Sequence, residues 1–377
     1  MKKICFIVAT PLTLRVFMRN HISCLTKEYE VTAIGNFSLD DLTDNWLPGV
    51  RLVAFPIRRN ISIFFDILAL LKLINFFYKE RFDAVHSVTP KAGFLAMTAA
   101  RFTQTPIRIH NLSGQVWAAR KGLFRALLKS IDRITIKNST RLLSDSFSQI
   151  TFLSNEGLVK TEQVEILGSG SICGVDSNRF KPNADLRRTV RDTLGIPDLG
   201  LIILFVGRLN KDKGILDLAE AFSQLAGQRD DVWLLVVGDY EEDIGDDFNS
   251  HCGSALSRVR RVGHTDCPEH YMAAADVFAL PSYRESFGLT VIEAAACGVP
   301  SAVSRIYGLT DSVLDGKTGL MYAPGDVPAI RDCLMRLCTD TILRLRLGNA
   351  AKLRANLEFS MQKVTTEFVA YYERILK

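Results

Sequence analysis

The sequence lacks the features that mark a secreted, fibrous or disordered chain. Its 377 residues include eight cysteines, which are scattered and form no CxxC pair. It contains no low-complexity tract and no short-period repeat. Because paired cysteines would indicate a disulfide framework or a zinc site, the scattered ones are interpreted as reduced thiols of a cytoplasmic protein.

Long uninterrupted apolar runs are also missing. The start, MKKICFIVATPLTLR, is similar to a signal peptide, but its apolar run stops at Pro11 and no small-residue cleavage site follows. It therefore predicts a first buried strand. The most apolar later segment, residues 61–78, contains Asp66, Lys72 and Asn75. We expect a buried helix there rather than a membrane span.

The formal charge of +5 is unevenly distributed along the chain. Residues 1–175 contain 22 lysines and arginines against 13 acidic residues, whereas the remainder contains 24 against 28. A basic first half and a mildly acidic second half indicate two domains with different partners.

Both halves alternate short apolar strands with helical patterns. The first half contains KICFIVA, EVTAIGN, VRLVAFPI, FDAVHSV and PIRIHNL, and the second contains LIILFVGRL, VWLLVVGD, DVFALPS and VPSAVS. This alternation predicts α/β architecture with two doubly wound parallel sheets. We place the first domain at residues 1–175, the second at 176–355 and a final helix at 356–377. In such sheets, ligands bind beyond the carboxyl ends of the strands.

One segment after a predicted strand, RESFGLTVIEAAACGVP, holds Glu285 and Glu293 eight positions apart. Ser286 to Gly288 should begin a helix whose free amides bind an anion. Glu293 would then lie two turns inside, and the helical rise would separate the carboxylates by about 12 Å. This length matches a nucleotide sugar laid between them. The alternative is two solvated glutamates beside an ordinary helix start.

A second segment, VGRLNKDKG, places Arg208 and Lys213 in a glycine-flanked loop after a strand. Guanidinium and ammonium groups in this position suit a phosphate, although a lysine-rich loop is often simply solvated.

Together, VGRLNKDKG, VVGD, DVFALPSYRESFGLTVIEAAACGVP and GKTGLMYAPGD resemble the donor domain of retaining glycosyltransferase family 4 enzymes. The resemblance covers most of residues 201–326. It implies the GT-B fold, in which two Rossmann-like domains face a central cleft and the last helix crosses back to the first domain. It assigns Arg208 and Lys213 to the donor diphosphate, Glu285 to the donor sugar and Glu293 to the ribose. It also directs the amides of Phe287, Gly288 and Leu289 toward the donor.

The first half resembles bacterial members that build capsule, exopolysaccharide or O-antigen repeats. The resemblance implies that His110, in IRIHNLSGQ, lies beside the donor sugar, while His86 is a weaker candidate. Many members have a Gly-Gly turn after the first strand. Here ATPLTLRVF replaces it with Thr10, Thr13 and Arg15, which leaves the acceptor contacts open.

The implied reaction is substitution at the anomeric carbon with retention, without a cofactor. No DxD follows a strand, and GDDF at residues 245–248 reads as a solvated loop, so we expect no metal requirement. The leaving diphosphate would be stabilised by Arg208, Lys213 and the helix N-terminus, and would itself take the acceptor proton.

A basic helical pattern at residues 121–137 suggests a surface for binding the membrane in which a lipid-linked acceptor resides. Lys121, Arg125, Lys129, Arg133 and Lys137 recur every four residues beside apolar side chains. Such a helix suits an anionic membrane surface, on the inner face of the cytoplasmic membrane, or is merely a solvated face. Nucleic acid is not expected, because stacking aromatics do not accompany the charge.

The leading hypothesis is a transferase that moves a hexose or N-acetylhexosamine from a UDP-sugar to a polyprenyl-diphosphate-linked saccharide. A sugar-nucleotide epimerase of the same fold and a non-catalytic sugar-nucleotide-binding subunit are the alternatives.

Overall fold

The computed structural model describes residues 1–57 and 62–377. The chain divides into two compact units, which are considered separately below. Unit 1 contains Met1–Cys173 and Gln362–Lys377, and unit 2 contains Gly174–Met361. The carboxyl-terminal helix α16 (Met361–Ile375) thus belongs almost entirely to the first unit, and residues 356–358 end the preceding helix, α15.

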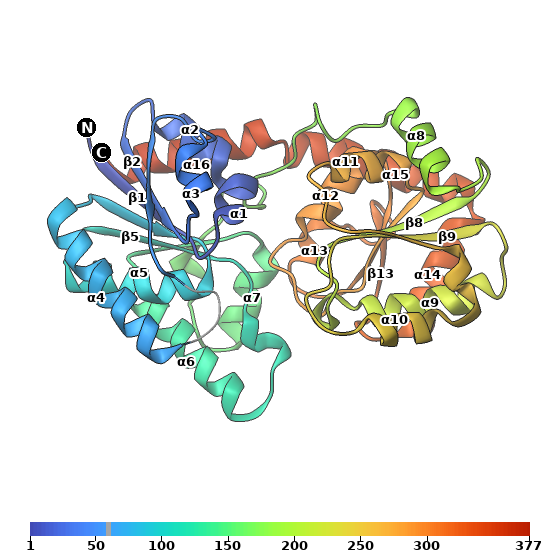
Figure 1. Ribbon diagram of the computed structural model, residues 1–377, viewed down its shortest axis with the longest axis horizontal. Helices are drawn as coiled ribbons and strands as arrows, with labels where there is room; N and C mark the ends of the chain where they lie inside the picture. Colours follow the sequence, from blue (N-terminus) through green and yellow to red (C-terminus); the bar gives the residue numbers. More distant parts are fainter. Residues whose placement is uncertain (58–61) are drawn as a thin grey trace. The chain divides into compact units, whose positions relative to one another are not determined.

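Unit 1 is built on a seven-stranded parallel sheet in the order β3-β2-β1-β4-β5-β6-β7 (Figure 1). Its strands are β1 Lys3–Ile7, β2 Glu30–Gly35, β3 Val50–Ala54, β4 Ala84–Ser87, β5 Ile107–Leu112, β6 Arg141–Ser144 and β7 Val164–Glu165. The helices between them are α1 Pro11–Thr13, α2 Arg19–Leu25, α3 Leu39–Thr43, α4 Ile63–Glu80, α5 Pro90–Phe102, α6 Gly122–Asn138 and α7 Phe147–Asn155. A π-helical turn at Leu14–Met18 and 3₁₀ turns at Val116–Ala119 and Thr161–Gln163 complete the unit.

Strand β1 shows how the sequence builds a core on each face of this sheet. Successive side chains of a strand point to opposite faces. Ile4 and Phe6 accordingly join a cluster that includes residues of α2 and α16, whereas Cys5 and Ile7 join a cluster with α4 and α5. Both sets are fully buried, which explains why the strand reads as an unbroken apolar run.

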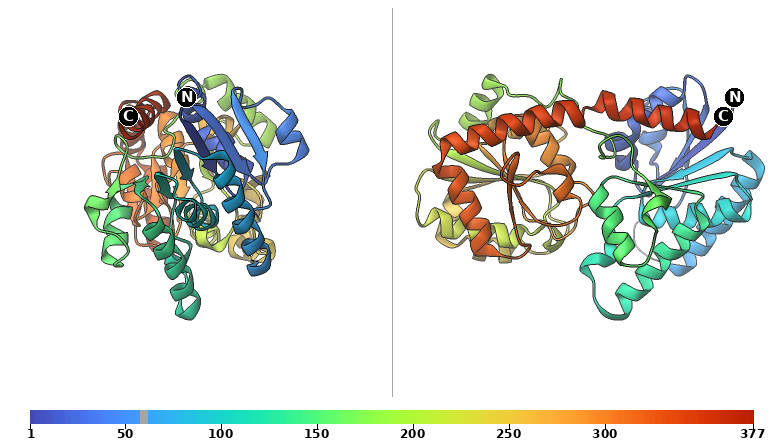
Figure 2. Two further views of the ribbon diagram at one scale, coloured as in Figure 1. Left: turned by 90° about the vertical axis from the view of Figure 1, so that its left-hand side faces the viewer. Right: turned by 180° about the vertical axis from the view of Figure 1, so that it is seen from behind.

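Unit 2 is built on a six-stranded parallel sheet in the order β10-β9-β8-β11-β12-β13. Its strands are β8 Leu201–Val206, β9 Val232–Val237, β10 Val259–Val262, β11 Val277–Leu280, β12 Ser301–Ser304 and β13 Gly319–Tyr322. Its helices are α8 Ala184–Leu194, α9 Ile215–Ala226, α10 Gly245–Cys252, α11 Pro268–Ala274, α12 Leu289–Ala296, α13 Leu309–Ser312, α14 Val327–Thr339 and α15 Thr341–Glu358. Short 3₁₀ turns lie at Lys211–Lys213 and Gly253–Arg258. Helices cover both faces of this sheet (Figures 1 and 2).

The prediction of a buried helix over residues 61–78 needs correction. Ile61 lies outside the described residues, and α4 begins at Ile63. Of its 18 residues only Ala69, Leu73 and Phe77 are buried, and most of its other apolar side chains are exposed. Within the described residues, no helix has both the length and the apolarity that crossing a membrane requires.

A buried histidine pair joins α16 to the rest of unit 1. His86 Nδ1 forms a 2.8 Å hydrogen bond with the Tyr372 hydroxyl, and His21 Nδ1 forms a 2.9 Å hydrogen bond with the Thr365 hydroxyl. Both rings also stack on Phe368. Burial lowers the pKa of His21 to about 4 and that of His86 to about 3, the latter with help from neighbouring histidines. Both are therefore neutral at pH 7 and help to hold α16 on unit 1.

The buried histidines predict acid sensitivity. Because their native pKa values lie below the unfolded value, their contribution to stability is complete above about pH 6.5 and declines as the pH falls toward the native pKa. When the pH is lowered from 7 to 5, each of the two histidines should reduce the free energy of unfolding by about 2 kcal/mol. The variant His86→Phe, which keeps an aromatic ring against Phe6 and Phe368, should lose less stability over this interval.

Urea denaturation at the two pH values measures this difference, with each protein compared with itself at pH 7. His251→Phe, in an exposed position of α10, is the matched control and should keep the wild-type pH dependence. If the free energy of unfolding depends on pH equally in His86→Phe and in wild type, the assignment of His86 as a buried neutral imidazole is contradicted.

Candidate active site

Four charged side chains of unit 2 lie in the loops that follow β8, β9 and β11. The carboxyl ends of parallel strands meet at one edge of a sheet, which is where ligands of such folds bind. Here that edge holds Arg208 and Lys213 after β8, Glu241 after β9 and Glu285 after β11.

Lys213 and Glu285 form the centre of this arrangement. Lys213 Nζ lies 2.5 Å from Glu285 Oε1, and the Ser282 hydroxyl donates to the same oxygen at 2.9 Å. The loops that carry them also meet through their backbones, since Tyr283 N donates to Asp212 O at 2.9 Å. Gly214 makes this approach possible: its φ is +69°, and a Cβ atom there would lie 2.1 Å from the carbonyl oxygen of Pro281.

Arg208 is held from one side only. Its Nη1 donates to both carboxylate oxygens of Glu241, at 2.6 and 2.7 Å. Asn210 Nδ2 donates to Glu241 Oε2 at 2.6 Å, so the carboxylate is fixed independently of the arginine. The guanidinium has five N–H groups, and its contacts with the described residues engage Nη1 alone, so its other N–H groups can bind an anion. Glu241 was not anticipated, because an acidic residue in an acidic loop carries no distinguishing signal.

Helix α12 begins at Leu289, with Gly288 as the N-cap residue and no side-chain hydrogen bond to the cap. Val291 N donates to Gly288 O at 3.0 Å, so within the described part of the chain the amides of Leu289 and Thr290 are the ones that this helix start can offer to an anion. The backbone just before it is tightly packed: a Cβ atom on Gly308 would lie 2.7 Å from Glu285 O and 2.9 Å from Phe287 N. The Phe287 side chain is buried against Phe359 and anchors this turn in the core.

The placement of Glu293 in the sequence analysis was wrong. It is the fifth residue of α12, just over one turn from the helix start, rather than two turns inside. The estimate of about 12 Å between the carboxylates assumed continuous helix from Glu285, and residues 285–288 are not helical. The separation of the two carboxylates therefore does not support the prediction that one nucleotide sugar spans them.

Glu293 occupies a recessed position among other ionisable groups. Burial raises its pKa to about 7, Arg179 opposes that increase, and Glu269 adds to it. Arg179 Nη2 lies 2.8 Å from Glu269 Oε2 and also donates to the carbonyl of Asp266. The sequence offered no signal for Arg179 or Glu269, because tertiary packing brings them near Glu293.

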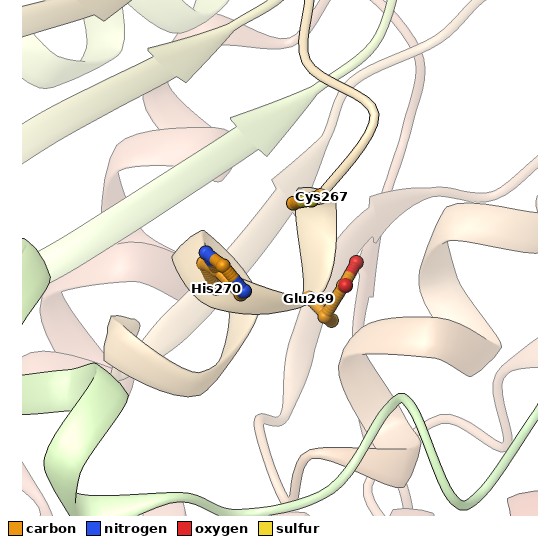
Figure 3. A group of neighbouring side chains, drawn as sticks. All are labelled: Cys267, Glu269 and His270. Carbon is orange, nitrogen blue, oxygen red and sulfur yellow. The ribbon is translucent and has the colours of Figure 1, made fainter.

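One group of side chains could in principle hold a metal ion. Ligand atoms of Cys267, Glu269 and His270, around the start of α11, lie within 4.8 Å of one another (Figure 3). A metal would have to compete with the guanidinium of Arg179 for the carboxylate of Glu269. A positive charge is thus already supplied to this carboxylate by the protein.

His110 lies in unit 1, within β5. Its Nδ1 shares a 2.8 Å hydrogen bond with the Ser87 hydroxyl, and a Cβ atom on Gly93 would lie 2.4 Å from its ring. Burial lowers its pKa to about 4, so the imidazole is neutral at pH 7. The ring is fixed in place by these contacts and can act as a neutral hydrogen-bonding group.

The basic pattern over residues 121–137 forms α6, but its cations do not share one outward face. Arg125 and Lys129 both pair with Glu156 at 2.7 Å and lie over the ring of Trp117. Lys121, Arg133 and Lys137 are exposed. The predicted five-residue basic face is therefore reduced to three, because the helix turns two of its cations toward α7.

The helical segment that follows β1 uses its charged residue, Arg15, to make contacts within unit 1. Arg15 pairs with Asp41 at 3.0 Å and lies 4.3 Å from the centroid of the Trp46 ring. Thr10 and Thr13 share a 3.2 Å hydrogen bond. Of the three residues that replace the Gly-Gly turn, Arg15 is thus committed to α3 and its neighbours.

Two families describe most of the chain. Residues 15–164 match Glycosyltransferase Family 4, and residues 187–354 match Glycosyl transferases group 1. The capsular polysaccharide biosynthesis glycosyltransferase CapM of Staphylococcus aureus is 32% identical over 324 residues, which cover 85% of this chain and 84% of that protein. The UDP-Gal:alpha-D-GlcNAc-diphosphoundecaprenol alpha-1,3-galactosyltransferase of Escherichia coli is 27% identical over 313 residues, covering 82% and 80%.

The architecture is also similar to solved structures. The Alr3699/HepE protein of Anabaena, solved in complex with UDP-glucose, has a TM-score of 0.82 over 99% of this chain and 100% of that one, at 17% identity. The predicted fold class, with two parallel-sheet α/β domains of GT-B type, is confirmed.

The environment of Glu293 can be tested directly. Replacing Arg179 by methionine removes the cation that lowers the pKa of Glu293, so this pKa should rise above about 7. Carbon-13 NMR titration of the glutamate side chains measures the value. Arg187→Met, at an arginine that pairs with Asp276 instead, should leave the pKa of Glu293 unchanged. A lower pKa in Arg179→Met would refute this description of the site.

Proposed function

This chain belongs to the glycosyltransferases of the GT-B fold, and we propose that it is a retaining enzyme of cell-envelope polysaccharide assembly. It transfers a hexose or N-acetylhexosamine from a UDP-sugar to a lipid-linked saccharide. The observation that carries this proposal is the pairing of cations with carboxylates at one edge of the second sheet: Lys213 with Glu285, and Arg208 with Glu241.

In the proposed reaction, each part of this edge has one task. Arg208, Lys213 and the first amides of α12 neutralise the diphosphate as the bond from the anomeric carbon to its oxygen breaks. Glu285 accepts hydrogen bonds from the sugar hydroxyls, and Glu293 accepts them from the ribose. The acceptor hydroxyl attacks the anomeric carbon on the face that the diphosphate leaves, and its proton passes to the departing phosphate oxygen. His110 contributes a neutral hydrogen-bonding group beside the sugar.

The charge balance at this edge supports the assignment. An incoming diphosphate brings negative charge to Lys213 and Arg208. Glu285, the partner of Lys213, then becomes available to the sugar hydroxyls, whereas Glu241 stays hydrogen-bonded to Asn210 and keeps Arg208 in position. Charge-assisted hydrogen bonds to phosphate are stronger than neutral ones, so this exchange is favourable. The proposal needs no metal, since the cations of the chain perform the neutralisation.

The acceptor and the cellular role are proposed from the relatives. One is a capsular polysaccharide glycosyltransferase, and the other is named for a UDP-sugar donor and a diphosphoundecaprenol-linked acceptor. An acceptor of this kind resides in a membrane, so we place the protein at the inner face of the cytoplasmic membrane, with an anionic lipid surface as its partner.

The two glutamates should differ in their effect on donor binding. At pH 8, above the pKa of about 7 of Glu293, Glu293→Gln should weaken UDP binding by about ten- to hundredfold, because a charged hydrogen-bond acceptor for the ribose is lost. Glu285→Gln should lower the turnover number while UDP binds almost as in wild type. Isothermal titration with UDP and steady-state kinetics separate the two effects.

Glu220→Gln, at an exposed position of α9, is the matched control and should behave as wild type in both measurements. An equal loss of UDP affinity in Glu285→Gln and Glu293→Gln would contradict the roles assigned to them.

A product assay distinguishes the transferase from the two alternatives. Candidate UDP-sugars are incubated with polyprenyl-diphosphate-linked saccharides and, separately, without acceptor, and products are identified by mass spectrometry and NMR. We expect a glycosylated lipid and free UDP only when acceptor is present. An epimerised UDP-sugar without acceptor would indicate an epimerase, and UDP binding without any turnover would indicate a binding subunit.

A further inference from the structure

Three side chains around the start of α11 bring together a thiol, a carboxylate and an imidazole. Cys267 is the N-cap residue of this helix, and Glu269 and His270 belong to its first turn. One ligand atom from each lies within 4.8 Å of the other two (Figure 3). Sulfur, oxygen and nitrogen donors are the ligands that zinc binds in proteins. The proposed transfer reaction uses none of these three residues.

The spacing of the three donors suits a zinc ion. Zinc holds its ligand atoms about 2.0–2.3 Å away in a tetrahedral arrangement, which places them roughly 3.5 Å from one another. The ligand atoms here therefore have to approach by at most roughly 1.3 Å, which rotation about side-chain bonds can supply. Cys267 and His270 are three positions apart, so they lie on the same side of one helical turn. Three protein ligands leave the fourth position to water.

The thiol and the imidazole are not engaged elsewhere. Cys267 Sγ and the His270 ring make no hydrogen bond or ion pair with any residue that the structure describes. Cys267 is exposed, so an ion can reach it from solvent. Glu269 Oε2 is buried and accepts no well-directed hydrogen bond within the described chain, although Arg179 Nη2 lies 2.8 Å away. A buried carboxylate oxygen of this kind keeps its capacity to coordinate a cation.

The chemistry of the donors decides which metal they select. Magnesium and calcium prefer oxygen ligands and would find one carboxylate here. Thiolate and imidazole favour zinc and similar transition metals instead. The magnesium ions that accompany nucleotides are therefore poor candidates for this group of side chains.

We propose that Cys267, Glu269 and His270 form a zinc site that modulates the neighbouring part of the donor site. On binding, the thiol releases its proton to solvent, and the sulfur, a carboxylate oxygen and an imidazole nitrogen coordinate the ion. Zinc thereby takes the place of the Arg179 guanidinium beside Glu269. The ion takes no part in the transfer itself, in which cations of the chain neutralise the diphosphate.

Arg179 links this zinc site to Glu293. Its guanidinium interacts electrostatically with both Glu269 and Glu293. A zinc ion on Glu269 repels the guanidinium, which is then drawn to Glu293 and competes there with the ribose hydroxyls. Zinc and UDP should therefore weaken each other's binding by the same factor. This step rests on the proposed function, because that function assigns Glu293 to the ribose.

Titration of the full-length protein with Zn²⁺, without nucleotide and with a non-chelating phosphine as reductant, tests the site itself. Cys267→Ser and His270→Ala should each weaken zinc binding by at least about tenfold, because each removes a ligand. Arg179→Met should strengthen it by about fivefold, because the competing cation is gone. Cobalt(II), used as a spectroscopic substitute, should show a thiolate absorption band that is absent in Cys267→Ser.

The matched control is Cys24→Ser with His251→Ala, at a half-buried thiol and an exposed imidazole outside this group. It should bind zinc as wild type does. The zinc site would be overturned if wild type does not bind zinc, or if Cys267→Ser and His270→Ala bind it as tightly as wild type. Weaker zinc binding in Arg179→Met would overturn the replacement of the guanidinium by the ion.

UDP titrations with and without zinc test the link to the donor site. Saturating zinc should raise the Kd for UDP about fivefold in wild type and leave it unchanged in His270→Ala and Arg179→Met. An equal change in His270→Ala would come from zinc bound to the nucleotide and would reject the link. If UDP does not bind at all, the proposed function fails, whereas the zinc titration without nucleotide still decides the zinc site.

Discussion

The approach of two loops at the carboxyl edge of the second sheet is the constraint on which the candidate site depends. Lys213 reaches Glu285 because Gly214 permits backbone contact with Pro281, where any larger residue would collide. Gly308 plays the same part for the turn that precedes α12. The two glycines contribute no functional group, yet they bring a cation, a carboxylate and a helix start within reach of one ligand.

That geometry brings charges together in a partly buried place, and three cations there are paired with carboxylates. An unpaired charge there would be costly to desolvate, whereas a paired one is tolerated. Lys213 pairs with Glu285, Arg208 with Glu241, and Arg179 with Glu269. Among the described residues Glu293 makes no such close pair, and burial raises its pKa to about 7. It is thus the group of this edge whose protonation responds most readily to a change in its surroundings.

The sequence predicted those parts of the molecule that rest on local pattern. Strands such as β1 and β8 are buried on both faces, so they read as apolar runs. In contrast, β6 and β10 were not predicted. Each is only four residues long and contains arginine, in RLLS and VRRV, so neither reads as an apolar run. Arg208, Lys213 and Glu285 were found through their place after strands. Glu241, Arg179 and Glu269 were not, because their proximity to the site depends on tertiary packing.

The same distinction explains why the first unit was interpreted less well. An apolar segment such as α4 suggests burial when only its composition is considered, but composition does not reveal which face has a partner. Three buried residues are enough to hold α4 on the sheet, and the remaining apolar side chains face outward. Two histidines are buried against α16, His21 and His86, and both are neutral. The excess of positive charge in this half of the sequence must therefore be carried outside the core. Arg125 and Lys129 are neutralised by Glu156, so part of that excess is borne by exposed cations of α4 and α6 such as Lys72, Arg133 and Lys137.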